Sequence, residues 1–273
     1  MSETTHRAAV TERAARAGGA VAKREFRTAL RVETKSSETD LVTNADREAQ
    51  EQVLATIAGE FPGARVVCEE EQHSIAGVDV DILASVPDSG DAWVVDPIDG
   101  TANYANEIRF WATSVAAISA GEPVAAATYL PALGDVYTAG PDSVLRNDGP
   151  MTVSDRTDPA AFTVGLLGRW APARAVRQGG FIREVTDRFG DARRFGSMQG
   201  VLGLVAAGSL DAAIMPDPPE PWDSIAGVYL LRRAGGTATT VDGDRWANGT
   251  GPLVVSNGEC HDRVCAAARA PAE

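Results

Sequence analysis

The chain has 273 residues, 44% of them hydrophobic, with a formal net charge of −13 and a pI of about 4.7. So acidic a surface repels phosphate backbones, which argues against general nucleic-acid binding, and no apolar run reaches the ~18 residues of a membrane span. The N-terminal MSETTHRAAV has no apolar signal core, and the three cysteines lack zinc-type spacing. We therefore expect a cytoplasmic protein with neither nucleic-acid nor membrane partners.

The first half of the chain predicts an α+β arrangement. Helical periodicity covers residues 5–31, and a polar loop without helix signals follows over 32–43. Thr43 or Asn44 can cap a second helix that runs to about Phe61. Strands are predicted at Ala64–Cys68, Trp93–Val95, Phe110–Ser119, Pro123–Tyr129 and Asp135–Ala139.

After about Ser154 strands alternate with helices, which is an α/β pattern. Strands are predicted at Phe162–Leu167, Ala192–Phe195, Leu210–Met215 and Leu253–Ser256. Helices are predicted at Ala175–Phe189, Met198–Ala207, Asp223–Ala234 and Glu259–Ala268. We divide the chain into an N-terminal α+β part over 1–154 and a C-terminal α/β part over 155–273.

The segment AWVVDPIDGT, residues 92–101, places two aspartates at the end of an apolar strand, which Pro97 is expected to break. Asp96, Asp99 and the Ile98 carbonyl can face one space and form a site for a hard cation. The backbone N–H groups of Gly100 and Thr101 begin a short helix, where an anion can bind. The combination predicts metal-assisted phosphate chemistry, although Asp-Pro and Asp-Gly are also common turn pairs.

Two further segments carry carboxylates at the ends of predicted elements. Glu69, Glu70 and Glu71 follow a strand, and Asp223 in PWDSIAG begins a helix behind a proline-rich loop. Each has a structural alternative, because an acidic loop is ordinary on an acidic protein and aspartate is a good helix cap. Their joint order along the chain is the stronger signal.

Five segments, in order and spacing, resemble the inositol monophosphatase family of magnesium-dependent, lithium-sensitive phosphatases. They are KSSETDLVTNAD (35–46), CEE (68–70), DPIDGTANY (96–104), RRFGS (193–197) and PWDSIAG (221–227). The resemblance covers essentially the whole chain. It implies a layered α-β-α-β-α sandwich of the inositol monophosphatase and fructose bisphosphatase type, usually a homodimer, with two or three Mg²⁺ ions and inhibition by Li⁺.

The resemblance implies a set of metal ligands at matching positions. Glu69, Asp96 and the Ile98 carbonyl would hold the first magnesium. Asp96, Asp99 and Asp223 would hold the second. Because three glutamates are adjacent, and Cys68 stands where the family usually has glycine, Glu70 is an alternative to Glu69.

The resemblance also implies the residues that act on water and phosphate. Asp46 would hydrogen-bond Thr101, which helps Glu69 to orient and deprotonate the attacking water, and Lys35 would lie near the metals. The phosphate and substrate site would comprise Gly100, Thr101, Gly196, Ser197 and Asp223.

The substrate stays open between an inositol phosphate and a sugar phosphate, with fructose-1,6-bisphosphate and 3′-phosphoadenosine-5′-phosphate as alternatives. The inositol-recognising acid of the animal enzymes falls on Pro216, with Asp217 and Glu220 as candidate substitutes. Candidate partners for a second phosphate are Arg169, Arg174, Arg193 and Arg194. A non-enzymatic alternative is a regulatory protein that docks on RNA or polymerase, against which the intact ligand set and the charge of −13 argue.

Overall fold

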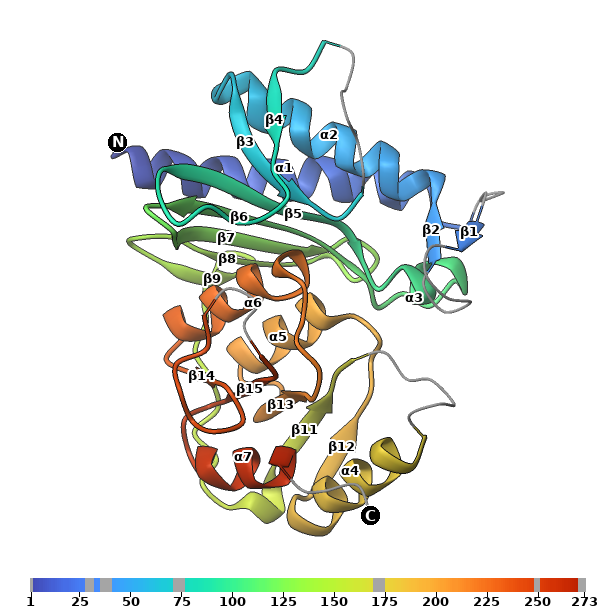
Figure 1. The fold of residues 1–273 in the computed structure, drawn as a ribbon, viewed down its shortest axis with the longest axis vertical. Coiled ribbons are helices and arrows are strands. Elements are labelled where there is room, and N and C mark those ends of the chain that lie inside the picture. The colour runs from blue at the N-terminus through green and yellow to red at the C-terminus, as the bar shows by residue number, and fades with distance from the viewer. Residues whose placement is uncertain are drawn as a thin grey trace.

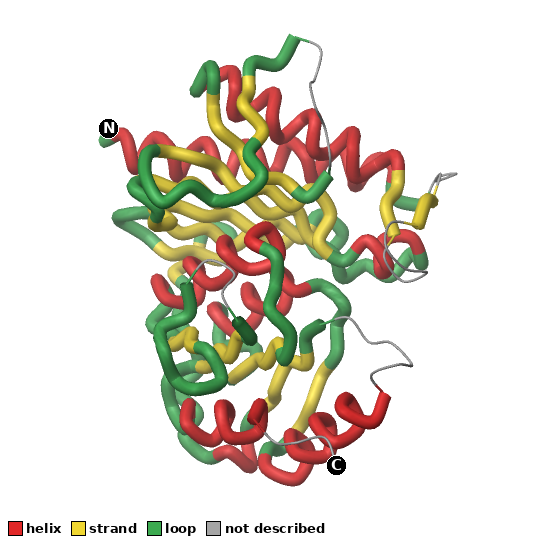
Figure 2. Tube along the Cα trace, viewed as in Figure 1, coloured by secondary structure: helices red, strands yellow, loops and turns green. Residues whose placement is uncertain are grey.

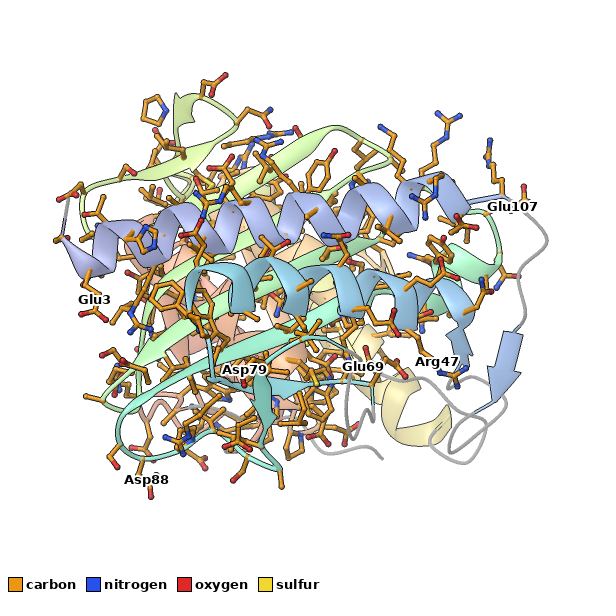
Figure 3. All side chains as sticks on the ribbon, turned by 90° about the horizontal axis from the view of Figure 1, so that it is seen from above. Glu3, Arg47, Glu69, Asp79, Asp88 and Glu107 are labelled. Carbon is orange, nitrogen blue, oxygen red and sulfur yellow. The ribbon has the colours of Figure 1, made fainter. Side chains whose placement is uncertain are left out.

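The elements form five layers in the order helix, sheet, helix, sheet, helix (Figure 1). The computed structural model describes residues 2–27, 32–34, 41–70, 77–168, 175–247 and 251–269. The outer helices α1 (Glu3–Glu25) and α2 (Asn44–Glu60) lie side by side over one face of the larger sheet (Figure 3). Between the sheets lie α5 (Met198–Ala206) and α6 (Pro221–Arg233), and the last layer holds α4 (Ala175–Arg188) and α7 (His261–Arg269). This is the layered sandwich that the resemblance in the motifs implies.

The larger sheet has eight strands in the order β10-β9-β8-β7-β6-β5-β3-β4 (Figure 2). Their bounds are β3 Ala64–Cys68, β4 Val80–Ile82, β5 Asp91–Asp99, β6 Ala112–Ser119, β7 Glu122–Leu130, β8 Asp135–Ala139, β9 Val144–Arg146 and β10 Gly149–Pro150. Strand β3 pairs parallel with β4 and β5, and the other pairs are antiparallel. Strand β5 is therefore interior to the sheet, and its carboxyl end adjoins that of β3.

The smaller sheet has five strands in the order β12-β11-β13-β15-β14. Their bounds are β11 Thr163–Leu166, β12 Asp191–Arg193, β13 Ala212–Met215, β14 Thr237–Thr239 and β15 Leu253–Ser256. Two short helices, α3 (Thr101–Ala105) and the 3₁₀ turn Pro159–Ala161, complete the described elements together with a small hairpin of β1 (Val32–Thr34) and β2 (Leu41–Thr43). None of the described helices is long and apolar enough to cross a membrane.

Several predicted boundaries are wrong. The region 32–43, predicted as a loop, contains the paired strands β1 and β2. The first helix ends at Glu25 rather than at residue 31, because Phe26 adopts an extended conformation. The strands β4, β9, β10 and β14 have no counterpart in the sequence analysis, since segments of two or three residues are too short to show alternation.

Strand β5 does not break at Pro97, which is a second correction. The strand runs on to Asp99, and its pairing with β6 is irregular between Asp96 and Asp99. The Pro97 carbonyl accepts a hydrogen bond from Thr113 Oγ1 at 2.7 Å, while the missing N–H is tolerated at the irregularity. In a regular strand residues three apart point to opposite faces, so the irregularity allows both aspartates to reach one cavity.

The central core is shared by both halves of the chain. Residues of the larger sheet, such as Val94 and Tyr137, belong to one buried cluster with Leu202 of α5, Leu230 of α6 and Trp246. A second cluster under α1 and α2 stabilises the outer face of the same sheet. The division of the chain at residue 154 stays a prediction, and packing of α5 and α6 against both sheets joins its two parts.

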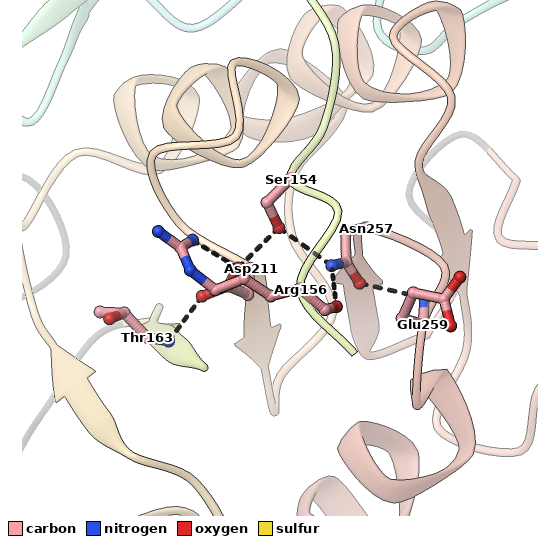
Figure 4. A network of polar contacts seen from close by, with 6 residues as sticks. All are labelled: Ser154, Arg156, Thr163, Asp211, Asn257 and Glu259. Atoms are coloured by element: carbon pink, nitrogen blue, oxygen red, sulfur yellow. Dashed lines mark hydrogen bonds and ion pairs between the residues drawn. The ribbon is translucent and has the colours of Figure 1, made fainter. Parts of the chain in front are cut away.

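A polar network fixes the connection between the two sheets (Figure 4). The fully buried Asp211 carboxylate accepts from Ser154 Oγ at 2.6 Å, Arg156 Nη1 at 2.8 Å and the Thr163 amide at 2.7 Å. Asn257 donates through Nδ2 to Ser154 Oγ and the Arg156 carbonyl, both at 2.9 Å. The segment that enters the smaller sheet is thereby held by β13 and β15.

We expect Asp211→Ala to lower the free energy of unfolding by about 3 kcal/mol, because it leaves donors without a partner in a buried site. Urea denaturation measures the change. The control Asp155→Ala alters an exposed carboxylate one residue from Ser154 and should stay within about 0.5 kcal/mol of the unaltered protein. Equal losses in both variants would contradict the importance of the network.

Candidate metal and phosphate site

A cavity of about 570 Å³ lies at the carboxyl end of β5. It is lined by nine of the predicted site residues, namely Glu69, Asp96, Ile98, Asp99, Gly100, Thr101, Gly196, Ser197 and Asp223. Of the other two, Asp46 lies behind Thr101 as its hydrogen-bond partner, and Lys35 falls outside the described residues. The fold therefore gathers segments from β3, β5, α3, α5 and α6 around one space.

Three aspartates form the acidic centre of this cavity. Asp96, Asp99 and Asp223 each present a carboxylate oxygen, and these atoms lie within 4.8 Å of one another. Asp96 is 1% exposed, and neither of its oxygens has a hydrogen-bond partner among the described residues. Burial raises the pKa of Asp96, and the charges of Glu69, Asp99, Asp223 and Asp46 raise it further. A buried carboxylate without donors is costly when ionised, so this group fits a divalent cation with a preference for oxygen ligands.

Asp99 has a second structural role that the sequence analysis missed. Its Oδ1 accepts from the Met198 amide at 2.9 Å, and its Oδ2 accepts from the Gln199 amide at 2.8 Å and from Ser197 Oγ. Burial raises the pKa of Asp99, and these donors offset part of that increase. The carboxylate thus caps the N-terminus of α5 from a distant part of the chain.

The adjacent glutamates Glu69 and Glu70 differ in whether they line the cavity. Glu69, labelled in Figure 3, lines the cavity, whereas the buried Glu70 is not among the lining residues and Glu71 lies outside the described residues. The backbone of Glu70 is paired with the amide of Gln50, at 3.1 Å from its N–H and 2.9 Å from its carbonyl. This placement favours Glu69 over Glu70 as the cavity-facing ligand. Burial raises the pKa of the neighbouring Cys68 to about 12, so that group stays a thiol.

Thr101 connects α2 to the end of β5. Its hydroxyl lies 3.2 Å from Asp46 Oδ1 and 3.0 Å from the Ile98 carbonyl, so the predicted hydrogen bond between Thr101 and Asp46 is present. The hydroxyl has one proton and donates fully to only one of these acceptors at a time. When it donates to Asp46, the lone pairs of the Ile98 carbonyl oxygen are not occupied by the Thr101 proton and can accept a cation.

Gly100 and Thr101 offer the cavity two backbone donors. Neither amide donates a hydrogen bond to any of the described residues. Gly100 has a φ of 94°, and a Cβ there would lie only 3.0 Å from the Gly196 carbonyl oxygen. The glycine therefore permits both the left-handed turn and the close approach of the 196–197 segment. Two open N–H groups beside the carboxylates fit a phosphate group.

Asn103 is a lining residue that the sequence analysis did not single out. Its Nδ2 donates to the carbonyls of Phe110 at 2.7 Å and Phe195 at 2.6 Å. It therefore binds the segment before Gly196 and Ser197 to the helix that follows the acidic strand end. Its place in DGTANY, three residues after Gly100, is the signal that could have identified it.

The rest of the cavity lining includes both apolar and charged side chains. The apolar residues include Leu166, Leu167, Met198, Met215, Pro218 and Pro219. The charged residues are Arg194, Asp217 and Glu220. Arg193 instead pairs with the neighbouring Asp191 and is not a lining residue, while Arg169 and Arg174 lie outside the described residues. Pro216 also does not line the cavity.

The five-layer fold and its carboxylate cavity define the class of layered sandwich proteins with an acidic site at a strand end. Within this class, the model of the inositol monophosphatase family matches residues 3–272, and the chain belongs to that family. Family membership supports a phosphatase.

Three relatives indicate the range of the similarity. An inositol-1-monophosphatase of Bacillus subtilis is 30% identical over 234 residues, which cover 84% of this chain and 83% of the relative. A histidinol-phosphatase of Mycobacterium tuberculosis is 32% identical over 244 residues, with 86% of each chain covered. The crystal structure of the extragenic suppressor protein suhB from Bartonella henselae is 27% identical, has a TM-score of 0.84, and covers 96% of this chain and 97% of its own.

We expect Asp96→Asn to stabilise the metal-free protein increasingly as the pH rises. Because the pKa of Asp96 is raised, the folded state binds more protons than the unfolded state above about pH 4, and stability falls with pH by up to about 1.4 kcal/mol per unit. The variant has no titrating group at position 96, so it does not lose stability with pH in this way. Thermal unfolding in chelator between pH 5 and 8 tests the difference, with Asp155→Asn as the exposed control; a gap that does not widen with pH would contradict it.

Proposed function

We propose that the protein is a magnesium-dependent phosphomonoesterase that acts on phosphorylated sugars or inositols. The observation that carries the proposal is the buried Asp96 carboxylate, which has no donor among the described residues and lies beside the open amides of Gly100 and Thr101. Glu69, Asp96 and the Ile98 carbonyl would hold one ion. Asp96, Asp99 and Asp223 would hold another. Bound magnesium would activate a water and neutralise the charge of the leaving oxygen.

The residues of the chain supply orientation and proton transfer. The Gly100 and Thr101 amides bind the phosphate oxygens and fix the phosphorus opposite Glu69. When Thr101 donates its proton to Asp46, its oxygen becomes an acceptor for the attacking water. Glu69 then accepts the other proton of this water as the bond to phosphorus forms and the bond to the ester oxygen breaks, and the leaving oxygen takes a proton from solvent. Asp46 thereby acts through Thr101 without contacting the substrate.

Asp99 can serve the metal and the helix cap together. Three donors, from Ser197, Gln199 and Gly200, converge on its Oδ2, whereas among the described residues only the Met198 amide bonds to Oδ1. A carboxylate oxygen has two lone-pair directions, so Oδ1 keeps one for a cation. The α5 dipole and its amides stabilise the charge of Asp99 in the absence of metal.

We expect Asp96→Asn and Glu69→Gln to lower turnover at saturating Mg²⁺ to less than about one tenth, or by more than about 1.4 kcal/mol in transition-state free energy. Phosphate release from a panel of phosphomonoesters, with and without Mg²⁺, measures the effect. Asp155→Asn is the matched control and should retain normal turnover. Full activity without divalent cations would disprove the proposed function.

Specificity is proposed to lie with the lining residues outside the metal and phosphate site, among which apolar side chains outnumber the candidate hydroxyl acceptors Asp217 and Glu220. We expect fructose-1,6-bisphosphate to be hydrolysed at least as efficiently as inositol-1-phosphate, with Arg194 facing the second phosphate. Arg194→Met should lower kcat/KM about tenfold for the bisphosphate alone, while Arg193→Met, which alters a residue paired with Asp191, should not.

The same panel should include histidinol phosphate, because one relative is a histidinol-phosphatase. A hundredfold preference for inositol-1-phosphate, about 2.7 kcal/mol, would contradict the predicted breadth. It would indicate that another residue takes the place of the acid that Pro216 replaces.

A further inference from the structure

Gln199 connects two ligand-bearing parts of the cavity through its backbone and its side chain. The residue lies in the first turn of α5 and is fully buried. Its amide N–H donates to Asp99 Oδ2 at 2.8 Å. Its Nε2 donates to the Trp222 carbonyl at 2.6 Å, and its Oε1 accepts from the Gly227 amide at 2.8 Å. One residue therefore contacts Asp99 and both flanks of Asp223.

The start of α6 has no side-chain cap from its own N-cap residue. The helix begins at Pro221, and that N-cap residue is Glu220. Asp223 lies in the first turn, directly after the Trp222 carbonyl to which Gln199 donates. The position of the Asp223 backbone is consequently tied to the first turn of α5.

A close approach of the two helices allows this bridge. A Cβ on Gly227 would lie 2.5 Å from Leu202 Cβ and 2.8 Å from Gln199 Oε1. Only glycine lets α6 come this close to α5 while the glutamine amide reaches its backbone. The packing of α6 against α5 therefore requires a glycine at position 227, the last residue of PWDSIAG.

The bridge acts against an electrostatic force. Asp96, Asp99 and Asp223 hold carboxylate oxygens within 4.8 Å of one another, and like charges at this distance repel strongly in a buried site. The uncharged side-chain amide of Gln199 on α5 bonds to α6 and resists the separation of the two helices without adding charge. Polar partners that orient metal ligands typically change metal affinity 10- to 100-fold when lost.

We propose that Gln199 is a positioning residue that sets the separation of Asp99 and Asp223, and through it the affinity of the cavity for divalent cations. The inference rests on the proposed function, since it assumes that these aspartates bind magnesium. Gln199 would act on the metal ligands without contacting the substrate.

The test replaces Gln199 by methionine, which keeps the side-chain volume and removes both hydrogen bonds. The matched control is Asn257→Leu, which removes a buried amide that joins the segment of Ser154 and Arg156 to the turn after β15 in the network of Figure 4 and does not line the cavity. For each protein, the melting temperature is measured as a function of Mg²⁺ concentration. KM and kcat for phosphate release are measured over the same range of Mg²⁺.

We expect Gln199→Met to raise the Mg²⁺ concentration for the half-maximal thermal shift about tenfold, with a parallel shift in the Mg²⁺ dependence of the rate. Asn257→Leu should lower the melting temperature and leave both midpoints unchanged. A Gln199→Met midpoint within twofold of the unaltered protein would overturn the proposal and leave Gln199 as a packing residue. No Mg²⁺ response in the unaltered protein would instead disprove the proposed function.

If Gln199→Met does not fold, hydrogen exchange of the Gly227 amide in the unaltered protein supplies the test. We expect this amide to be protected already without Mg²⁺, and to gain no more protection from the ion than buried amides of the larger sheet gain, because the bridge to Gln199 Oε1 forms before the ion binds. Protection that arises only with Mg²⁺ would show that the ion holds α6 in place, and would overturn the proposal.

Discussion

The mutual repulsion of buried carboxylates is the constraint on which the rest of this structure depends. Asp96 has no donor among the described residues, and the charges around it raise its pKa. The fold must hold Asp96, Asp99 and Asp223 together against this repulsion. The strand irregularity at Pro97, the cap that Asp99 makes on α5 and the packing of α6 against α5 each contribute to that end.

Two buried glutamines each bond to the backbone beside a residue that lines the cavity. Gln50 of α2 pairs with the N–H and the carbonyl of Glu70, next to Glu69. Gln199 of α5 bonds to a carbonyl and an N–H on either side of Asp223. A primary amide suits this position because it supplies a donor and an acceptor without adding charge to an acidic site.

Three side chains of the DGTANY motif form hydrogen bonds to distant parts of the chain. Thr101 reaches Asp46 on α2, Asn103 reaches the Phe195 carbonyl, and the buried Tyr104 hydroxyl donates to the Ala22 carbonyl of α1 at 2.7 Å. The short helix α3 is thus fixed from three sides, although five residues would not form a stable helix alone. The open amides at its start owe their orientation to these anchors.

Local sequence by itself determined most elements and the chemistry of the acidic strand end. The long helices and strands follow from periodicity, and Asp96 to Thr101 lie within six residues, so their proximity needs no long-range contact. The role of Asp223 and the layered fold were predicted from the resemblance in motif order. Tertiary structure alone placed Glu69 in the cavity lining and Glu70 outside it, because the two residues have the same local propensity and differ in the space they face. It alone joined Asp99 to α5 and Gln199 to α6, because these partners are far apart in the chain and meet only when both sheets pack against the central helices.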